Sequence, residues 1–291
     1  MASVDIDTHI EMIPEVWSTF ILDALTKNLV LAPLTDRRWE GLFASQGGNR
    51  VHIPSGPTIT ATKEAITNVR NPAANDWDTA ITVANPDPTE TNLDLDIRAY
   101  AAVRVDEPVQ MLSKLPVVDY YSTELGRSLA QQVDTDIGTT LDGTTNVKGT
   151  DNIPVTDPVI RDSREVLDNN DVKPDERFLV VSPATLMDML AIERYSNSLY
   201  AAISGVQPMK GRGYVGKIYE FDVYETTNLP AGAAGKKNFL FQKEAVAFAM
   251  PWGVKFDTRE YVDRFAVLLR ARVYYGDVLL RGGAVVEVDA R

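Results

Sequence analysis

The chain has 291 residues, 44% of them hydrophobic, and carries 29 Lys and Arg against 41 Asp and Glu, a net charge of −12. This charge has the wrong sign for a protein that grips phosphates by releasing counterions, so the composition excludes a tight DNA or RNA binder. The lack of cysteine excludes disulfides, thiolate metal sites and cysteine nucleophiles.

The N-terminal region has acidic residues where a signal peptide would carry positive charge, and no run of about 18 apolar residues follows. We therefore expect a protein made and folded in the cytosol. Residues 14–30 begin with a proline suited to a first helical turn and place Trp17, Phe20 and Ile21 on one apolar stripe. This pattern predicts an amphipathic helix near the N-terminus.

Residues 92–105 alternate strictly between apolar and polar side chains. The apolar positions are Leu93, Leu95, Ile97, Ala99, Ala101, Val103 and Val105. The pattern predicts one strand of about 14 residues, roughly 45 Å long, which is comparable to the width of a compact domain of this length. We expect a long hairpin in which residues 49–54 and 58–66 pair with this strand, with residues 77–83 near the tip. Its apolar face would need cover from another subunit.

A second helix is predicted over about residues 118–141, because apolar side chains recur there every three or four residues. They are Val118, Tyr121, Leu125, Leu129, Val133, Ile137 and Leu141. The helix would be roughly 35 Å long. We assign Asp134 and Asp136 to its solvated side.

Residues 155–245 read as a small α/β unit. The expected elements are a helix over 157–170, a strand over 177–182, a helix from Pro183, and strands over 217–225 and 238–250.

Gly211, Gly213 and Gly216 fit the G-x-G-x-x-G spacing of a dinucleotide site. The motif requires a helix after the last glycine, whose N-terminus would hold the phosphate, but a strand-like run follows here. A Gly-rich loop is therefore the better interpretation. The two histidines, His9 and His52, have no metal-ligand spacing, and His52 sits in an alternating strand pattern. We expect no catalytic residue, cofactor or metal.

The C-terminal region repeats the alternating pattern. Phe265, Val267, Leu269, Ala271, Val273 and Tyr275 would share one face of a strand, and Arg264, Arg270 and Arg272 the other. Solubility and pairing between subunits both remain open as roles for these arginines. The other basic groups, Arg37 with Arg38 and Lys236 with Lys237, are expected to be solvated or ion-paired.

The order of these elements resembles the major capsid proteins of tailed bacteriophages, which have the Hong Kong 97-type fold. Local phrases are also similar to that family: NLVLAPLTDRRWEG, RVHIPSG, RFLVVSPATLMDML, GYVGKIYEFDVYETTNLP and EAVAFAM. The resemblance spans nearly the whole chain.

The resemblance implies an α+β fold with an N-terminal arm, a long E-loop hairpin, a peripheral domain with a spine helix and an α/β axial domain. The expected boundaries are 1–35 for the arm, 36–49 for the start of the peripheral domain, 50–105 for the E-loop, 106–154 for the peripheral domain with its spine helix, 155–245 for the axial domain and 246–291 for the returning strands of the peripheral domain. Some family members crosslink subunits through a lysine and an asparagine, and Lys63 lies in the hairpin. Because nothing in this sequence identifies its partner or a catalytic glutamate, we do not extend that chemistry to this chain.

The implied function is self-assembly of pentamers and hexamers in the host cytoplasm into an icosahedral virion shell. This shell would enclose double-stranded DNA without sequence-specific binding and would not involve a membrane. A separate scaffolding protein, a portal and a decoration protein are expected partners. The assembly-interface candidates are Trp17, Phe20, Ile21, Arg70, Trp77, Leu93, Leu95, Arg98, Gly211, Gly213 and Gly216. An encapsulin-type bacterial compartment is the alternative with the same fold.

Overall fold

The computed structural model describes residues 29–56, 61, 89–108, 117–196, 214–233, 235–261 and 265–290. Contacts divide the chain into two compact units, Met1–Val51 with Leu93–Arg291, and His52–Asn92. The described helices are η3 (Ala32–Leu34), α2 (Glu40–Gln46), α4 (Val117–Leu141), α5 (Asp157–Asn169), α6 (Pro183–Ala191), α7 (Glu193–Ser196), η5 (Lys243–Ala245) and η6 (Gly282–Ala284). The described strands are β1 (Arg50–Ser55), β2 (Thr89–Asp94), β3 (Ile97–Asp106), β4 (Val147–Gly149), β5 (Arg177–Val181), β6 (Tyr214–Ile218), β7 (Phe221–Glu225), β8 (Asn238–Gln242), β9 (Val246–Tyr261), β10 (Ala266–Leu279) and β11 (Val285–Asp289).

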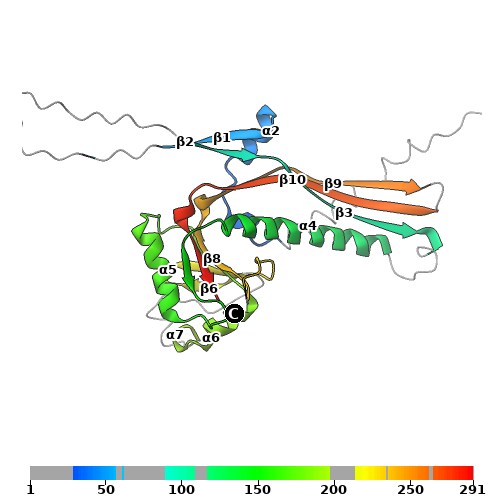
Figure 1. Ribbon diagram of the computed structural model, residues 1–291. Coiled ribbons are helices and arrows are strands. Elements are labelled where there is room, and N and C mark those ends of the chain that lie inside the picture. The colour runs from blue at the N-terminus through cyan, green and yellow to red at the C-terminus, as the bar shows by residue number, and fades with distance from the viewer. Residues whose placement is uncertain are drawn as a thin grey trace, which may run out of the picture. The chain divides into compact units, whose positions relative to one another are not determined.

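In the larger unit, α4 lies against a three-stranded antiparallel sheet of order β3-β10-β9 (Figure 1). The helix predicted over 118–141 is confirmed, and its 25 residues correspond to about 37 Å. Its buried stripe includes Leu125, Leu129 and Val133, which is the predicted three-and-four spacing. β9 and β10, with 16 and 14 residues, are long compared with an average strand of about 5–6 residues.

The second sheet of this unit has six strands in the order β4-β11-β8-β5-β7-β6. Every residue of β5 and β8 is buried, as expected for strands in the middle of a covered sheet. The side chain of Asn238 fixes this region, because its Oδ1 accepts from Ser182 N at 2.7 Å and its Nδ2 donates to Val288 O at 3.1 Å. The sheet also includes β4 and β11, which lie outside the residues 155–245 that the sequence assigned to the α/β unit.

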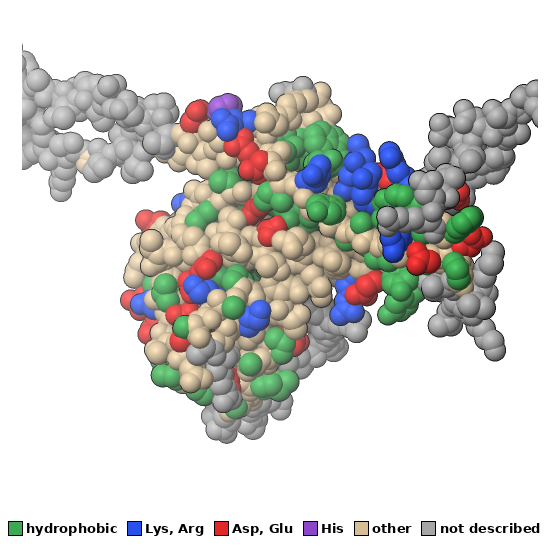
Figure 2. All heavy atoms as spheres, turned by 45° about the vertical axis from the view of Figure 1, so that its right-hand side comes forward, with side chains coloured by type: hydrophobic (Ala, Val, Ile, Leu, Met, Phe, Trp, Pro, Cys, Tyr) green, Lys and Arg blue, Asp and Glu red, His purple; other side chains and the backbone are tan. Residues whose placement is uncertain are grey.

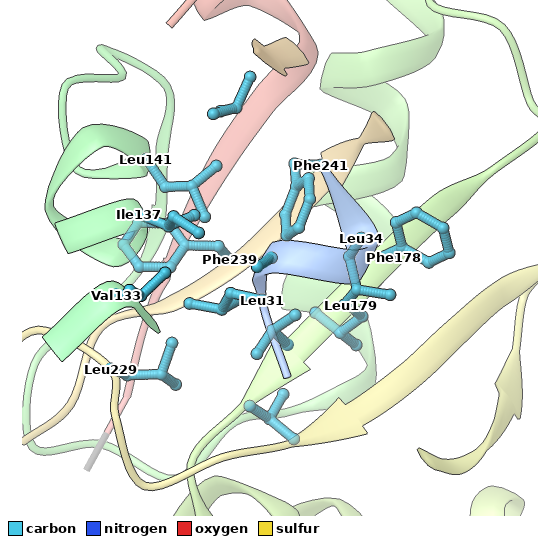
Figure 3. Close-up of a cluster of buried hydrophobic side chains, with 14 of the residues drawn as sticks. Leu31, Leu34, Val133, Ile137, Leu141, Phe178, Leu179, Leu229, Phe239 and Phe241 are labelled. Atoms are coloured by element: carbon cyan, nitrogen blue, oxygen red, sulfur yellow. The ribbon is translucent and has the colours of Figure 1, made fainter. Parts of the chain in front are cut away.

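A single hydrophobic cluster joins these layers (Figure 3). Side chains from residues 31–34, α4, β5 and β8 meet there, among them Leu31, Ile137, Leu179 and Phe239. Each of these four side chains is at most 2% exposed, so the start of the described chain is as deeply packed as the sheet itself. None of the helices in the described part of the chain is long and apolar enough to span a membrane.

The prediction of a single strand over residues 92–105 is wrong. The chain breaks at Leu95 and Asp96, so β2 pairs with β1 and β3 pairs with β10, in different sheets. Leu95 N donates to Asn49 O at 2.8 Å, and the Asp94 carbonyl lies so close to Gly276 that a Cβ there would be 1.8 Å from its oxygen. The change of partner strand, which alternation cannot reveal, causes the break.

Two other predicted strands are also divided. Residues 217–225 form a tight hairpin, β6 and β7, which turns at Tyr219 and Glu220, both with positive φ. Residues 238–250 are interrupted by η5, so that β8 belongs to the six-stranded sheet and β9 to the three-stranded one. The helices expected over 157–170 and from Pro183 and the strand over 177–182 are confirmed as α5, α6 and β5.

Candidate assembly surface

The three-stranded sheet has one face against α4 and another that carries most of its charge. The register places Leu269, Ala271 and Val273 on the buried face, opposite Val103, Ala101 and Ala99 of β3. Residues one step away point to the other side, which we call the basic face. It is made of Arg98, Tyr100, Ala102, Arg104 and Asp106 from β3, Leu268, Arg270, Arg272 and Tyr274 from β10, and Trp252, Lys255, Asp257 and Arg259 from β9.

Cations outnumber acids on the basic face by six to two among its described residues. Asp257 accepts from Arg270 at 2.7 Å and lies 3.3 Å from Arg272, and Asp106 lies 3.4 Å from Arg104. Figure 2 shows Lys and Arg side chains gathered over this sheet. The two acids therefore neutralise only part of the face, although the whole chain is acidic.

Positively charged side chains lie next to one another on the basic face. Arg272 is directly opposite Lys255 in the register, an arrangement that destabilises a sheet in isolation. The Nε atoms of Arg270 and Arg272 are buried and have no hydrogen-bond partner in the described part of the chain. The contacts within the described chain therefore satisfy these two guanidinium groups only in part.

Aromatic side chains alternate with these cations. Tyr100 is 66% exposed and Trp252 is 42% exposed, and the Trp252 ring packs edge-on against Tyr274. The Arg98 guanidinium lies 6.0 Å from the centre of the Tyr100 ring. Exposed arginine, tyrosine and tryptophan are the residues most enriched at protein–protein interfaces.

α4 also holds the start of the described chain. Asp134 accepts hydrogen bonds from Val30 N at 2.9 Å and Leu31 N at 3.0 Å, and it is completely buried. Burial raises the pKa of Asp134 to about 6, although these hydrogen bonds oppose the shift. The prediction that Asp134 lies on the solvated side of the helix is therefore wrong, because residues 30 and 31 cover it.

Asp136 is half-buried and accepts a hydrogen bond from the Tyr275 hydroxyl of β10. One turn further along α4, the Thr140 hydroxyl donates to Asp277. Burial, and then the nearby Asp136 and Asp96, raise the pKa of Asp277. These contacts fix α4 to β10. Asp136 thus belongs to the contact between α4 and β10. The prediction that it is freely solvated is therefore wrong.

A polar cluster lies where the chain leaves α7. Asp157 Oδ1 accepts from the hydroxyls of Tyr195 and Tyr219, each at 2.6 Å, and Oδ2 accepts from Arg194 at 3.1 Å. Burial raises the pKa of Asp157, but the two tyrosines and Arg194 outweigh it and hold that pKa below its ordinary value. The cluster connects α5, α7 and the β6–β7 turn.

The described structure places four of the predicted interface residues. Leu93 is completely buried by this chain's own residues, so its side chain is a core position and offers no surface to another copy. Leu95 is half-buried, and Arg98 is exposed on the basic face. Gly216 is buried in β6, which runs into the turn and β7, so a strand follows the glycines as the sequence suggested.

The other interface candidates lie outside the described residues. They are Trp17, Phe20, Ile21, Arg70, Trp77, Gly211 and Gly213. Lys63, Arg264 and the predicted helix up to residue 28 also fall outside them.

Of the face predicted for the C-terminal strand, Leu269, Ala271, Val273 and Tyr275 are buried as expected, and Val267 is half-buried. The prediction that Phe265 shares this face is wrong, because Phe265 precedes β10, has a φ of 46° and is 72% exposed. Arg270 and Arg272 do lie on the opposite face. The pairs expected for other basic residues are present, such as Arg38 with Asp36 at 2.6 Å and Lys237 with Asp142 at 2.5 Å.

Sequence reasoning missed the basic face as a whole. The residues that form it come from three segments, 98–106, 252–259 and 268–274. Basic residues spaced by even numbers within each segment were a usable signal, but only the register unites them. In the described part of the chain, no group of three or more His, Cys, Asp or Glu side chains could hold a metal ion.

The fold of the chain is similar to that of several solved structures. The fold is similar to a structure titled Mycobacterium phage Che8, with a TM-score of 0.71 and 19% identity, over 89% of this chain and 90% of that one. It is also similar to Mycobacterium phage Adephagia, with a TM-score of 0.63 and 12% identity, over 100% and 99% of the two chains. A virus-like particle from Pyrococcus furiosus gives a TM-score of 0.58 and 10% identity, over 95% and 99%.

These likenesses show that the chain shares a mixed helix-and-sheet fold with the solved phage structures. Residues 102–288, more than half of the chain, match the family model described as phage capsid protein. Among curated proteins, none matches this sequence. The chain belongs to the phage capsid protein family, which confirms the resemblance drawn from the sequence and assigns the protein to the virion as a structural shell component.

Proposed function

We propose that the protein is the major capsid protein of a tailed phage and forms pentamers and hexamers that close into an icosahedral shell around double-stranded DNA. The observation that carries the proposal is the family match over residues 102–288, which contain α4, nearly all of the six-stranded sheet and most of the three-stranded sheet. The fold-level likeness to phage structures supports it, because it extends over most of both chains.

In this proposal the described elements correspond to the parts of a Hong Kong 97-type subunit. The three-stranded sheet with α4 is the core of the peripheral domain, and the six-stranded sheet, mostly within residues 155–245, is the axial domain. Residues 1–35 are proposed as the arm and 50–105 as the E-loop. Because residues 31–34 pack in this chain's own core and β3 pairs with β10, the parts proposed to overlap neighbouring subunits are the residues before Leu29 and those before β3. Many modest contacts then add up to a stable closed assembly.

The proposal includes no catalytic step, cofactor or metal. A separate scaffolding protein guides assembly in the host cytoplasm, a portal occupies one vertex, and a decoration protein binds the finished shell. Contact with the DNA does not depend on sequence, since an acidic chain gains little from phosphates.

The test is expression of the full chain, alone and with the products of neighbouring genes, followed by sedimentation and electron microscopy. We expect closed particles of uniform size. A chain that sediments as a compact monomer under every co-expression would contradict the proposal.

An encapsulin-type compartment remains the second candidate, favoured by the likeness to the virus-like particle from Pyrococcus furiosus. The phage capsid family match outweighs it. A neighbouring portal or terminase gene would support the virus, whereas a neighbouring ferritin-like or peroxidase gene would support the compartment.

A further inference from the structure

We propose that the basic face is the docking surface for an acidic N-terminal segment, residues 5–15, of a second copy of this chain. The inference rests on the proposed function, because assembly brings a second copy to this face. It adds to that function by identifying one receiving surface and the segment that fills it.

The first step is that the face requires an anionic partner. Six cations share it with two acids, and Arg272 is directly opposite Lys255. Lys255, Arg259 and Arg98 are exposed, so their charges are available to a neighbour. Because the whole chain carries −12, everything outside this face is still more acidic, and another copy is an abundant anion in a shell.

The second step is that a protein segment fits better than packaged duplex DNA. The exposed rings of Tyr100 and Trp252 cannot stack on bases that are already paired inside a duplex, whereas they serve well as anchors in a protein interface. A strip of arginines with interleaved aromatic side chains therefore favours an acidic, partly apolar peptide.

The third step identifies the segment. Asp5, Asp7 and Glu11 occupy odd positions, so an extended backbone would present these three carboxylates on one side, and Glu15 follows at the start of the helix predicted over residues 14–30. Ile6, Ile10 and Met12 occupy even positions and would lie on the other side, and no Lys or Arg occurs before Lys27.

Residues 71–97 are the other stretch of more than 25 residues without Lys or Arg. Its acids are less available, because Glu90 lies 3.3 Å from His52 and Asp94 pairs with Arg50 at 2.5 Å. Asp76, Asp78, Asp87 and the exposed Asp96 remain in it, spread over a longer span than the four N-terminal acids. Charge density thus favours residues 5–15.

The fourth step is that the segment comes from a second copy. The described chain begins at residues 29–31, whose backbone is bonded to Asp134 on α4. Because α4 packs on the opposite face of the sheet, residues 30 and 31 lie on the side away from the basic face, and a segment of the same copy would have to pass around the sheet to reach it.

The test is a charge swap in the full-length chain. Lys255→Glu with Arg259→Glu reverses the face, and Asp7→Lys with Glu11→Lys reverses the segment. Each pair alone should raise the protein concentration needed for half-maximal particle formation by roughly tenfold or more, since like charges then face each other. All four changes together should restore it to within about twofold of the wild-type value. Arg127→Glu with Arg281→Glu, both exposed positions away from this face, is the control matched for net charge.

The outcomes separate the candidate partners. If the variant with all four substitutions does not recover particle formation while the wild type still forms particles, this inference is overturned and the proposed function stands. Rescue of the reversed face by Asp76→Lys with Asp78→Lys instead would assign the face to residues 71–97. Loss of encapsidated nucleic acid from the reversed face, without rescue by either swap, would assign it to DNA. An absence of wild-type particles would contradict the proposed function itself.

A crosslinking experiment tests the same contact without mutations. A carbodiimide joins amines to carboxylates that touch, and Lys255 is the lysine among the described residues of this face. In a mixture of ¹⁵N-labelled and unlabelled copies, we expect mass spectrometry to find Lys255 joined to residues 5–15 across isotopes. Crosslinks found only within one isotope would show that the segment belongs to the same copy, which would overturn the assignment.

Discussion

Asp134 is the residue that attaches the start of the described chain to α4. Its carboxylate satisfies two backbone N–H groups, those of Val30 and Leu31, in a fully buried position. Buried donors that lose their acceptor cost about 1–3 kcal/mol each. The connection therefore depends on one side chain.

Asp134→Ala should lower the free energy of unfolding by roughly 2–4 kcal/mol, because both donors lose their acceptor. Asp134→Asn keeps one carbonyl oxygen and should cost about half as much. Denaturant titration measures both. Gln131→Ala, at an exposed position on the same helix, is the control, and an Asp134→Ala variant as stable as this control would contradict the assigned role.

The raised pKa of Asp134 predicts a pH dependence. In the folded state the pKa is about 6, against 3.8 for an ordinary aspartate, so the folded chain holds this proton more tightly. The stabilisation is fully present below about pH 4 and is lost as pH rises to about 6, by roughly 3 kcal/mol. The difference in unfolding free energy between the wild type and Asp134→Asn should therefore change across this window. A constant difference from pH 4 to pH 7 would show that the carboxyl titrates normally.

The sequence could not reveal this role. Asp134 follows Val133 of the apolar stripe, and a charged residue beside such a stripe is ordinarily solvated. Its partners are more than 100 positions away in the chain. Only the packing of residues 29–34 onto α4 extends the buried stripe to include it.

At the scale of elements, Gly276 on β10 determines how β2 and β3 meet. The Asp94 carbonyl occupies the space where a side chain would stand, at the point where the chain leaves one sheet for the other. A methyl group cannot fit there unless two backbone segments separate.

Gly276→Ala should lower the free energy of unfolding by about 3 kcal/mol or more, because backbone yields less readily than a side chain. Gly253→Ala is the matched control on β9, since nothing lies within 4 Å of a Cβ built there, and should change stability by less than about 0.5 kcal/mol. The midpoints of thermal unfolding of the two variants measure this difference in stability. Equal midpoints would mean that the close approach has no energetic consequence.

Periodicity identified element types better than element limits. The spacing of Leu125, Leu129 and Val133 sufficed for α4, because one face of a helix records its burial in the local sequence. Alternation also identified the buried face of β3 correctly. It could not show that residues 95 and 96 separate two strands, or that 217–225 turns back on itself, since the choice of partner strand is not a local property.

At the scale of the whole molecule, composition concealed the distribution of charge. A net charge of −12 argued against polyanion binding, and that holds for the average surface. The register of β3, β10 and β9 nevertheless gathers six cations on one sheet face. The predicted residue Arg98 belongs to this face, whereas Leu93 is part of the core.

A cryo-electron-microscopy reconstruction of particles formed by the full-length chain tests the central claim most directly. We expect pentamers and hexamers of this fold in a closed icosahedral shell, with residues from adjacent copies lying over one another. A chain found only as separate subunits, or particles with no contact between adjacent copies beyond the six-stranded sheets, would contradict the account.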